Sequence, residues 1–479
     1  MASISGSQFD ATANGTGQPV DNTYTSDGTV PPPVPGVFNL EVYSSDPTNA
    51  PTQPAFGYDG LVILSNIVDG VAEKITLAGS AFSITDLGSG NDTIVAMGSD
   101  ETVAGNPDGS PVTIIISGID DVVIGGGQDT ITVYGFGDTV NGFGNDLVAV
   151  YGTADVINLG SGGDTITVNG DNDTVNPGSG ADLMAVTGWQ DSVMGGSGPD
   201  TITATGSYDT IAGGDGADTI TANGLFDSVA SGSGADLIYL TGLGDTAIGG
   251  TGPDTMTAVG TDEVVVVGSG SALVKVTGVN DSVNGGSGAD TISVSGLSDT
   301  VIGGTGPETI TAIGTFDVIQ AGSGTDSITA TGVADTVYGG SGPDTINVYG
   351  IYDSVSGGSG PETINVYGSY DIVATGTGAE TINVSGNFDT VGFGAQGDTT
   401  TALANLTGQN TMIVDGPNTY NDTVMGFSQA AGDTIHLTGG HTVMNTTSQN
   451  GGQNTLITLN DGSTILLKGI ASISPSFFS

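Results

Sequence analysis

Acidic residues recur at nine-residue intervals through most of this chain. Every ninth position from Asp146 to Asp398 is Asp or Glu, with Ala272 as the one exception. An aliphatic residue usually follows each acid by two positions, as Ile202 follows Asp200 and Ile211 follows Asp209, and we expect this column to point inward. A short fixed period of this kind is the sequence signature of a solenoid, in which each repeat packs on its neighbours.

Neighbouring nonapeptides differ, so the structural repeat is a pair of them. Residues 195–203 read GGSGPDTIT, whereas residues 204–212 read ATGSYDTIA and carry one glycine. Each 18-residue coil therefore contains two turns and two short strands, and successive coils stack about 4.8 Å apart. We expect an all-β, right-handed parallel β-roll or β-solenoid of about 17 coils with β-rich terminal caps.

The residue types of the glycine-rich turn suit a hard cation. Glycine adopts positive φ and lets the backbone turn sharply, which aims carbonyl oxygens into the space between neighbouring coils. The aspartate adds a carboxylate. Because calcium takes six to eight oxygen ligands at about 2.3–2.6 Å, carbonyls and carboxylates from successive turns would suit it, and each ion would tie one coil to the next.

Five turns carry the motif G-G-x-G-x-D in full, and they begin at Gly195, Gly213, Gly249, Gly285 and Gly339. This series resembles the RTX, or haemolysin-type, calcium-binding nonapeptide repeat family. The resemblance implies several bound Ca²⁺ ions. It implies the following aspartate ligands: Asp92, Asp129, Asp146, Asp164, Asp182, Asp200, Asp218, Asp236, Asp254, Asp290, Asp326 and Asp344. It also implies participation of these turn residues: Gly195, Ser197, Gly213, Asp215, Gly249, Thr251, Gly285, Ser287, Gly339 and Ser341.

Some positions depart from that family pattern. The alternate turns, such as Thr205–Asp209, lack the GGxG segment, so the resemblance favours calcium along one edge of the roll and leaves the other edge open. Glu308, Glu362 and Glu380 place a longer carboxylate where the motif has aspartate.

Composition narrows the function classes. The formal net charge is −49, with 52 acidic residues against three Lys and Arg, which excludes nucleic-acid binding through phosphate contacts. Stacked like charges repel unless they are countered, so the roll is expected to fold when calcium binds. The chain has no cysteine, and we expect neither a membrane-spanning stretch nor a Sec-type signal.

The chain divides into four predicted regions. Residues 1–58 form a low-complexity arm, 59–87 an N-terminal β cap, 88–400 the roll, and 401–479 a C-terminal β cap. Residues 421–479 also resemble the C-terminal domains of RTX proteins exported by type I secretion, on the segments VMGF, GDTIHL and DGSTILLKGI and the pair Phe477–Phe478. We therefore expect an extracellular or bacterial cell-surface location.

Function is expected to lie on the surface, because roll, caps and arm account for most of the chain. Our interpretation is a structural, self-assembling protein of a surface layer, filament or matrix, with calcium and either itself or a cell-surface polysaccharide as partners. The alternatives are ice binding through Thr pairs such as Thr201 and Thr203, and carbohydrate binding through aromatic residues that precede the alternate acids. No catalytic motif is present, so we expect no enzyme.

Overall fold

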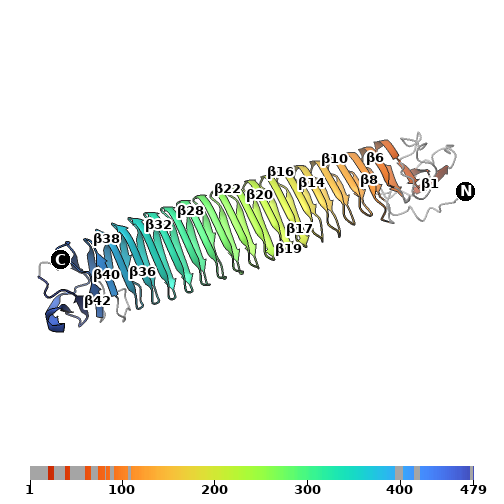
Figure 1. Ribbon diagram of the computed structural model, residues 1–479. Helices are drawn as coiled ribbons and strands as arrows, with labels where there is room; N and C mark the ends of the chain where they lie inside the picture. The colour runs from red at the N-terminus through yellow and green to blue at the C-terminus, as the bar shows by residue number, and fades with distance from the viewer. Residues whose placement is uncertain are drawn as a thin grey trace. The chain divides into compact units, whose positions relative to one another are not determined.

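The computed structural model describes residues 20–25, 38–43, 60–65, 74–80, 82–86, 91–105, 109–393, 403–414, 421–474 and 478. The chain divides into two compact units, Met1–Leu237 and Ile238–Ser479. Both are built of parallel strands stacked coil upon coil (Figure 1). The predicted fold class is confirmed: the chain is an all-β parallel β-solenoid of about 17 coils of about 18 residues.

One coil of the first unit illustrates the plan. A long strand, β18 (Thr201–Ser207), leads through the turn residue Tyr208 and Asp209 into a short strand, β19 (Thr210–Asp215). The glycine-rich turn then returns the chain to Asp218 and to the next long strand, β20 (Thr219–Leu225). Long strands pair only with long strands, and Thr201 lies beside Thr219 in the parallel ladder.

In the first unit the long strands are β4 (Lys74–Ser80), β6 (Asp92–Ser99), β8 (Val112–Ile119), β10 (Thr130–Phe136), β12 (Leu147–Thr153), β14 (Thr165–Asp171), β16 (Leu183–Trp189), β18 and β20. The short strands are β1 (Val20–Thr25), β2 (Phe38–Tyr43), β3 (Gly60–Ser65), β5 (Phe82–Asp86), β7 (Thr102–Ala104), β9 (Val122–Ile124), β11 (Thr139–Asn141), β13 (Val156–Asn158), β15 (Thr174–Asn176), β17 (Ser192–Ser197), β19 and β21 (Ser228–Ser233).

The second unit has the same arrangement of strands. Its first long strand, β22 (Leu237–Leu243), begins at the last residue of the first unit. Its other long strands are β24 (Thr255–Thr261), β26 (Leu273–Val279), β28 (Thr291–Leu297), β30 (Thr309–Thr315), β32 (Ser327–Val333), β34 (Thr345–Ile351), β36 (Thr363–Ser369), β38 (Thr381–Asn387), β40 (Leu403–Thr407) and β42 (Asn421–Met425). Its short strands are β23 (Thr246–Gly250), β25 (Val264–Gly268), β27 (Ser282–Asn284), β29 (Thr300–Gly304), β31 (Val318–Ser323), β33 (Thr336–Ser341), β35 (Ser354–Gly358), β37 (Ile372–Ala374), β39 (Thr390–Phe393), β41 (Thr411–Val414) and β43 (Thr434–Leu437).

The core is a stack of aliphatic side chains. Ile202 and Ala204 of β18 are fully buried, and Ile211 of β19 is 1% exposed. Ile202 and Ile211 belong to the column two residues after each acid, and the structure confirms that this column points inward. The long strands bury a second residue, such as Ala204, because they extend for seven residues and every other side chain faces in.

Parts of the predicted arm lie outside the described residues, namely 1–19, 26–37 and 44–58. The strand-like segment within it, β2, pairs with β1 and β3 of its own chain in the short-strand ladder. This pairing places Phe38–Tyr43 within the stack of the first unit.

The C-terminal end of the second unit changes from parallel to antiparallel pairing. β42 lies parallel to β46 (Thr464–Lys468), which pairs antiparallel with β45 (Asn454–Leu459), and β45 pairs antiparallel with β44 (Val443–Gln449). A single 3₁₀ turn, η3 (Asn450–Gly452), joins β44 to β45. Antiparallel strands close a parallel stack without presenting another coil edge, as expected of a β-rich cap.

Candidate calcium sites on two carboxylate columns

The acids that follow the glycine-rich turns form one column, here called the glycine-edge column. Every aspartate assigned to it from the sequence is buried, with exposed fractions of 1–3%. These aspartates are Asp92, Asp129, Asp146, Asp164, Asp182, Asp200, Asp218, Asp236, Asp254, Asp290, Asp326 and Asp344. The carboxylates therefore lie inside the wall of the roll.

Each aspartate uses one carboxylate oxygen to hold the coil before it. The backbone N–H of Asp200 donates to Oδ1 of Asp218 at 2.9 Å, and that of Asp182 donates to Oδ1 of Asp200 at 2.9 Å. The other oxygen, Oδ2, of both Asp200 and Asp218 is buried and has no hydrogen-bond partner among the described residues. A buried carboxylate oxygen without a partner is costly, so it indicates a missing ligand.

The first glycine of each glycine-rich turn explains how oxygens come together at this edge. A Cβ atom on Gly195 would lie 2.3 Å from the carbonyl oxygen of Gly213 and 2.7 Å from Oδ2 of Asp200. A Cβ on Gly249 would meet the carbonyl oxygen of Val267 and Oδ2 of Asp254 in the same way, at 2.6 and 2.7 Å. Glycine is required because a side chain would fill the space that a carbonyl of one coil and a carboxylate of another share.

The remaining turn residues suggested by the resemblance fall into two groups. The first glycines, Gly195, Gly213, Gly249, Gly285 and Gly339, are buried beside the column. The third residues, Ser197, Asp215, Thr251, Ser287 and Ser341, are exposed, and the Asp215 carboxylate accepts a hydrogen bond from Ser233 on the outside. The side chains of this second group face solvent, so these residues could bind calcium only through their backbone carbonyl oxygens. Their assignment as ligands stays a prediction.

The acids of the alternate turns form a second column, here called the alternate-edge column. The Asp191 N–H donates to Oδ1 of Asp209 at 3.0 Å, as in the first column. Oδ2 of each of these two aspartates is buried and lacks a hydrogen-bond partner within the part of the chain that the structure describes. The resemblance to known repeats did not identify this column as a calcium site. Its acids nevertheless recur in the nine-residue period as regularly as those of the glycine-edge column.

Burial gives the carboxyl groups of both columns unusual acidity. Desolvation raises the pKa of Asp200 to about 6, and the charges of Asp182 and Asp218 add to the rise. In the alternate-edge column, desolvation raises the pKa of Asp209 to about 7 and that of Glu263 to about 8. A cation bound against the carboxylates would counter both the burial and the repulsion between them.

Between Asp92 and Glu380 the glycine-edge column is interrupted twice. Val112 and Ala272 occupy the position of the acid, and the backbone N–H of each still donates to the next aspartate, Asp129 and Asp290 respectively. The gap at Ala272 is evident from the sequence, whereas the one at Val112 was not predicted. The first coils have repeats of 20 and then 17 residues, so counting by nines loses the register there.

Two glutamates of this column, Glu308 and Glu362, sit differently from the aspartates, whereas Oε1 of Glu380 accepts a hydrogen bond from the Gly378 N–H at 2.7 Å. Both carboxylate oxygens of Glu308 and of Glu362 are buried without a hydrogen-bond partner in the described residues. Desolvation raises the pKa of Glu308 to about 8 and that of Glu362 to about 7. The longer side chain therefore reaches the column with both oxygens available.

No three Asp, Glu or His side chains converge on one point among the described residues. A calcium ion at either edge would therefore take most of its ligands from backbone carbonyls, with one or two carboxylates. This arrangement fits the chemistry of calcium, which accepts carbonyl and carboxylate oxygens in flexible geometry.

Comparison with known families agrees with this geometry. A family model that describes four copies of the RTX calcium-binding nonapeptide repeat matches several segments of the chain. These are residues 87–108, 151–184, 194–229, 277–310 and 311–346. These segments of the roll match the RTX family. RTX nonapeptide repeats bind calcium, so the predicted cofactor is supported. A search among curated proteins gives no match to the chain.

The RTX roll also carries exposed aromatic residues in its alternate turns. Tyr208, Phe226, Tyr352, Tyr370 and Phe388 are 45–57% exposed. The rings stack on one another from coil to coil, with centroids 5.1–5.2 Å apart in the pairs Tyr208–Phe226, Tyr352–Tyr370 and Tyr370–Phe388. Because each ring covers the face of its neighbour, the edges of these rings, more than their faces, are presented to solvent.

The Thr pairs suggested for ice binding form ladders of limited length. Thr201 and Thr203 lie in register with Thr219 and Thr221. In the preceding coil the same two positions hold Leu183 and Ala185. The regular hydroxyl array is therefore broken within the first unit.

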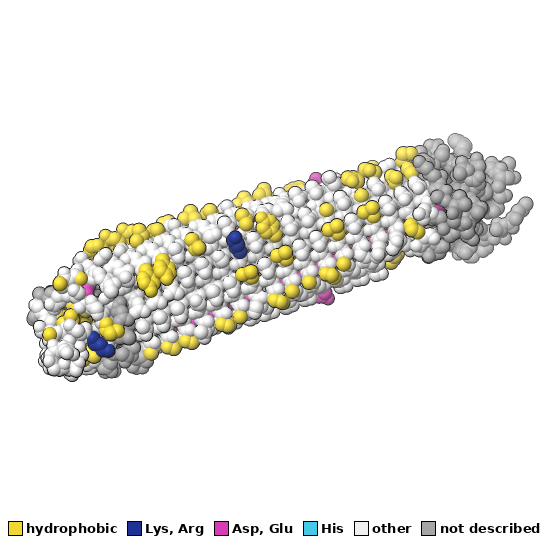
Figure 2. All heavy atoms as spheres, in the orientation of Figure 1, with side chains coloured by type: hydrophobic (Ala, Val, Ile, Leu, Met, Phe, Trp, Pro, Cys, Tyr) yellow, Lys and Arg dark blue, Asp and Glu magenta, His cyan; other side chains and the backbone are white. Residues whose placement is uncertain are grey.

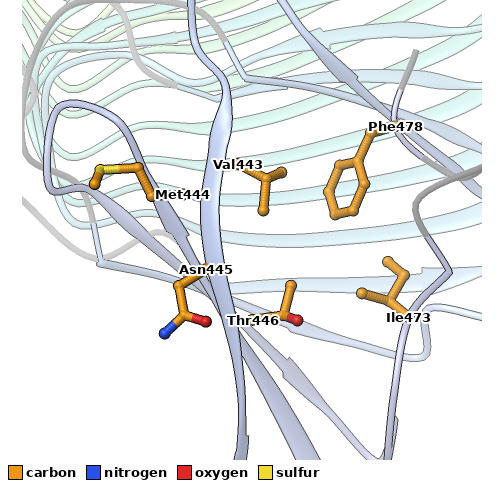
Figure 3. A pocket seen from close by; sticks show the side chains of 6 residues that line it. All are labelled: Val443, Met444, Asn445, Thr446, Ile473 and Phe478. Atoms are coloured by element: carbon orange, nitrogen blue, oxygen red, sulfur yellow. The ribbon is translucent and has the colours of Figure 1, made fainter.

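A shallow hollow of about 390 Å³ lies in the C-terminal cap beside β44. Its lining includes Val443, Met444, Ile473 and Phe478 (Figure 3). Phe478 also forms an isolated bridge with Ile435. Within the described part of the chain, no helix combines the length and apolar character that a membrane crossing would need.

Proposed function

We propose that this chain is a secreted calcium-binding RTX β-roll that folds outside the cell and serves as a self-assembling structural component. The observation that carries the proposal is the pair of buried carboxylate columns. Free calcium is abundant outside the cell, so numerous weak sites would be filled only there. Folding on export would follow, because metal binding supplies folding free energy.

The surface of the calcium-loaded roll favours association. Most of the acidic side chains are in the buried columns, and the visible face of the described residues shows few Asp or Glu atoms among polar neutral and hydrophobic side chains (Figure 2). With the columns neutralised by calcium, two rolls would approach each other with little electrostatic repulsion. The large formal charge of the sequence is thus compatible with self-association.

The aromatic residues of the alternate turns give the contact surface. Tyr208, Phe316, Tyr352, Tyr370 and Phe388 have φ of 64–67°, a left-handed conformation that costs an aromatic residue about 1–2 kcal/mol. Stacking offsets part of this cost for four of them, at about 0.5–1.5 kcal/mol per pair.

Phe316 has no such compensation from its own column. The equivalent positions in the adjacent coils hold Ser298 and Ala334, and the ring is 57% exposed. A strained and exposed ring is explained by a contact outside the chain. We assign that contact to a second copy, because its aromatic residues would repeat at the same coil spacing of about 5 Å.

Association is tested by light scattering during a calcium titration of the metal-stripped protein, with circular dichroism measured on the same samples. We expect strand signal first and large particles with it or after it. A protein that stays monomeric at high concentration with saturating calcium would remove the self-assembly role and leave the calcium-binding roll intact.

A variant separates assembly from folding. Asn occupies the same left-handed position at Asn172 and Asn280, so Tyr352→Asn, Tyr370→Asn and Phe388→Asn together should preserve the fold and relieve strain. We expect the triple variant to gain full strand signal in calcium and to scatter far less light than the parent. Undiminished scattering would show that the aromatic edge is not the contact.

A further inference from the structure

The alternate-edge column is more continuous than the glycine-edge column. Beginning at Glu101, it has an acid in every coil through Asp389, whereas the glycine-edge column is interrupted at Val112 and Ala272. Over this span every turn that lacks the GGxG segment keeps a carboxylate, and Asn410 takes the place of the acid in the coil after Asp389. A solvated surface would not require this regularity, and these carboxylates are not solvated: Asp173, for example, is 1% exposed.

Each alternate turn also brings a backbone carbonyl to its carboxylate. A Cβ atom on Gly170 would lie 1.7 Å from the carbonyl oxygen of Gly152 and 2.9 Å from Oδ2 of Asp173. On Gly278 it would lie 1.8 Å from the carbonyl oxygen of Gly260 and 2.8 Å from Oδ2 of Asp281. The single glycine of this turn thus leaves room for a carbonyl of one coil beside a carboxylate of the next, as at the other edge.

The left-handed residue before each acid takes over the turning role of the missing glycines. Tyr208 has φ of 64° and Asn172 has φ of 62°, and both precede an aspartate of this column. The backbone therefore makes the tight turn without GGxG. A search for the GGxG motif would therefore not identify a calcium site in an alternate turn.

The unpartnered oxygens are the independent sign of a ligand. Oδ2 of Asp155, Asp173, Asp191, Asp299 and Asp335 is buried, each residue is at most 1% exposed, and none of these oxygens has a hydrogen-bond partner among the residues that the structure describes. The sequence offers only three Lys and Arg residues as positive charges, and Lys275 and Lys468 are exposed on the outside. A cation from solution is the partner that remains.

We propose that the alternate-edge column is a second line of calcium sites, each formed by a carboxylate of one coil and a glycine carbonyl of the coil before it. The site goes beyond the RTX motif, because the turns that build it do not contain GGxG. It does not depend on self-assembly.

The chain provides its own reporter for these sites. Trp189 is the only tryptophan, and it lies two residues before Asp191 of the alternate-edge column. The nearest glycine-edge acid of the same coil, Asp182, lies at the opposite end of β16, about 20 Å away at about 3.3 Å per residue. Terbium(III) takes the place of calcium at oxygen sites and emits when an excited indole lies close to it. Emission excited through tryptophan therefore reports the alternate edge.

The experiment compares two triple variants in the same coils. Asp173→Asn, Asp191→Asn and Asp209→Asn remove charge from the alternate edge and keep an oxygen to accept the neighbouring N–H. Asp164→Asn, Asp182→Asn and Asp200→Asn are the matched control on the glycine edge. Calcium bound per chain is counted by mass spectrometry after equilibrium dialysis, and circular dichroism in saturating calcium verifies the fold.

We expect tryptophan-sensitised terbium emission from the parent protein, displaced by calcium. The alternate-edge variant should lose most of this emission, and its calcium count should fall by about three if each carboxylate serves one ion. The control should lose a similar number of ions and keep the emission. An alternate-edge variant with the parental emission and calcium count would overturn the proposal.

Terbium binding to the parent protein is a second test of the proposal, and it does not require the variants to fold. If terbium restores the strand signal and saturates binding, yet excitation of Trp189 gives no sensitised emission, no ion lies near the alternate edge and the proposal is wrong. A roll that binds calcium at the glycine edge alone would give this result, and its calcium-dependent folding at that edge would remain.

Discussion

Replacing Gly332 by alanine tests how closely successive coils approach at the alternate edge. Gly332 lies near the end of β32, in register with Gly314 and Gly350 of the adjacent long strands. A Cβ atom there would lie 1.7 Å from the carbonyl oxygen of Gly314, whereas ordinary contact begins at 3.4 Å. The two backbones would have to separate by about 1.7 Å, the difference between these distances.

The size of the effect follows from the hydrogen bonds that such a separation breaks. If about three or four ladder bonds are lost, each with a net value of about 0.5–1.5 kcal/mol, the free energy of unfolding falls by about 4 kcal/mol. Backbone conformation does not oppose the substitution, because Gly332 is not in the left-handed region. Without the contact, alanine would stabilise the strand by about 0.5–1 kcal/mol.

Urea unfolding in saturating calcium measures this difference. The control is Gly392→Ala in β39, where the nearest atom to a new Cβ, the carbonyl oxygen of Val373, is 3.7 Å away. We expect a large fall in the unfolding midpoint for Gly332→Ala and an unchanged or raised midpoint for Gly392→Ala, with a gain of at most about 1 kcal/mol. Equal midpoints for the two variants would refute the close approach of the coils. They would also refute the alternate-edge calcium site, which depends on that approach.

Three further predictions concern the columns and the core. Ala272→Asp should add about one calcium ion per chain, stabilise the roll in calcium and destabilise it in chelator; ion counting and urea unfolding check this, and an unchanged ion count contradicts it. Ile346→Ala should lower the free energy of unfolding by about 2–5 kcal/mol, because Ile346 is fully buried, and the exposed Tyr349→Ala should cost clearly less. Without calcium, the raised pKa values of Asp173, about 7, and Glu263, about 8, lie above their ordinary values of 3.8 and 4.5. The stability that these two groups contribute should therefore be complete below about pH 4 and lost as the pH rises through 7–8; thermal melts in chelator that instead improve toward pH 8 would contradict this sign.

The repeat plan could be predicted from the sequence because it depends on period alone. The spacing of acids and aliphatic residues gave the coil length, and residues such as Ile202 and Ile211 were correctly placed inside. The glycine-rich turns were recognised for a physical reason, since their glycines permit the turn that GGxG requires. The match of the RTX model to the repeat region confirms that part of the reading.

Other features depended on neighbours that a period does not reveal. The position of Val112 was missed because the coil that contains it has 20 residues. The left-handed conformation of Tyr208 runs against the preference of aromatic residues, so no local rule predicts it. The face-to-face stacking of Tyr370 on Tyr352 and Phe388 depends on the distance between coils, and it disfavours carbohydrate binding through open ring faces.

The central claim is that cations hold the carboxylate columns together, and one titration tests it most directly. The protein is stripped of metal with chelator at pH 8, where both columns would be charged, and calcium is returned stepwise while bound ions are counted and strand content is followed by circular dichroism. The account predicts little strand signal in chelator and a rise that keeps pace with the number of ions bound. Full strand signal at pH 8 with no ion bound would contradict it.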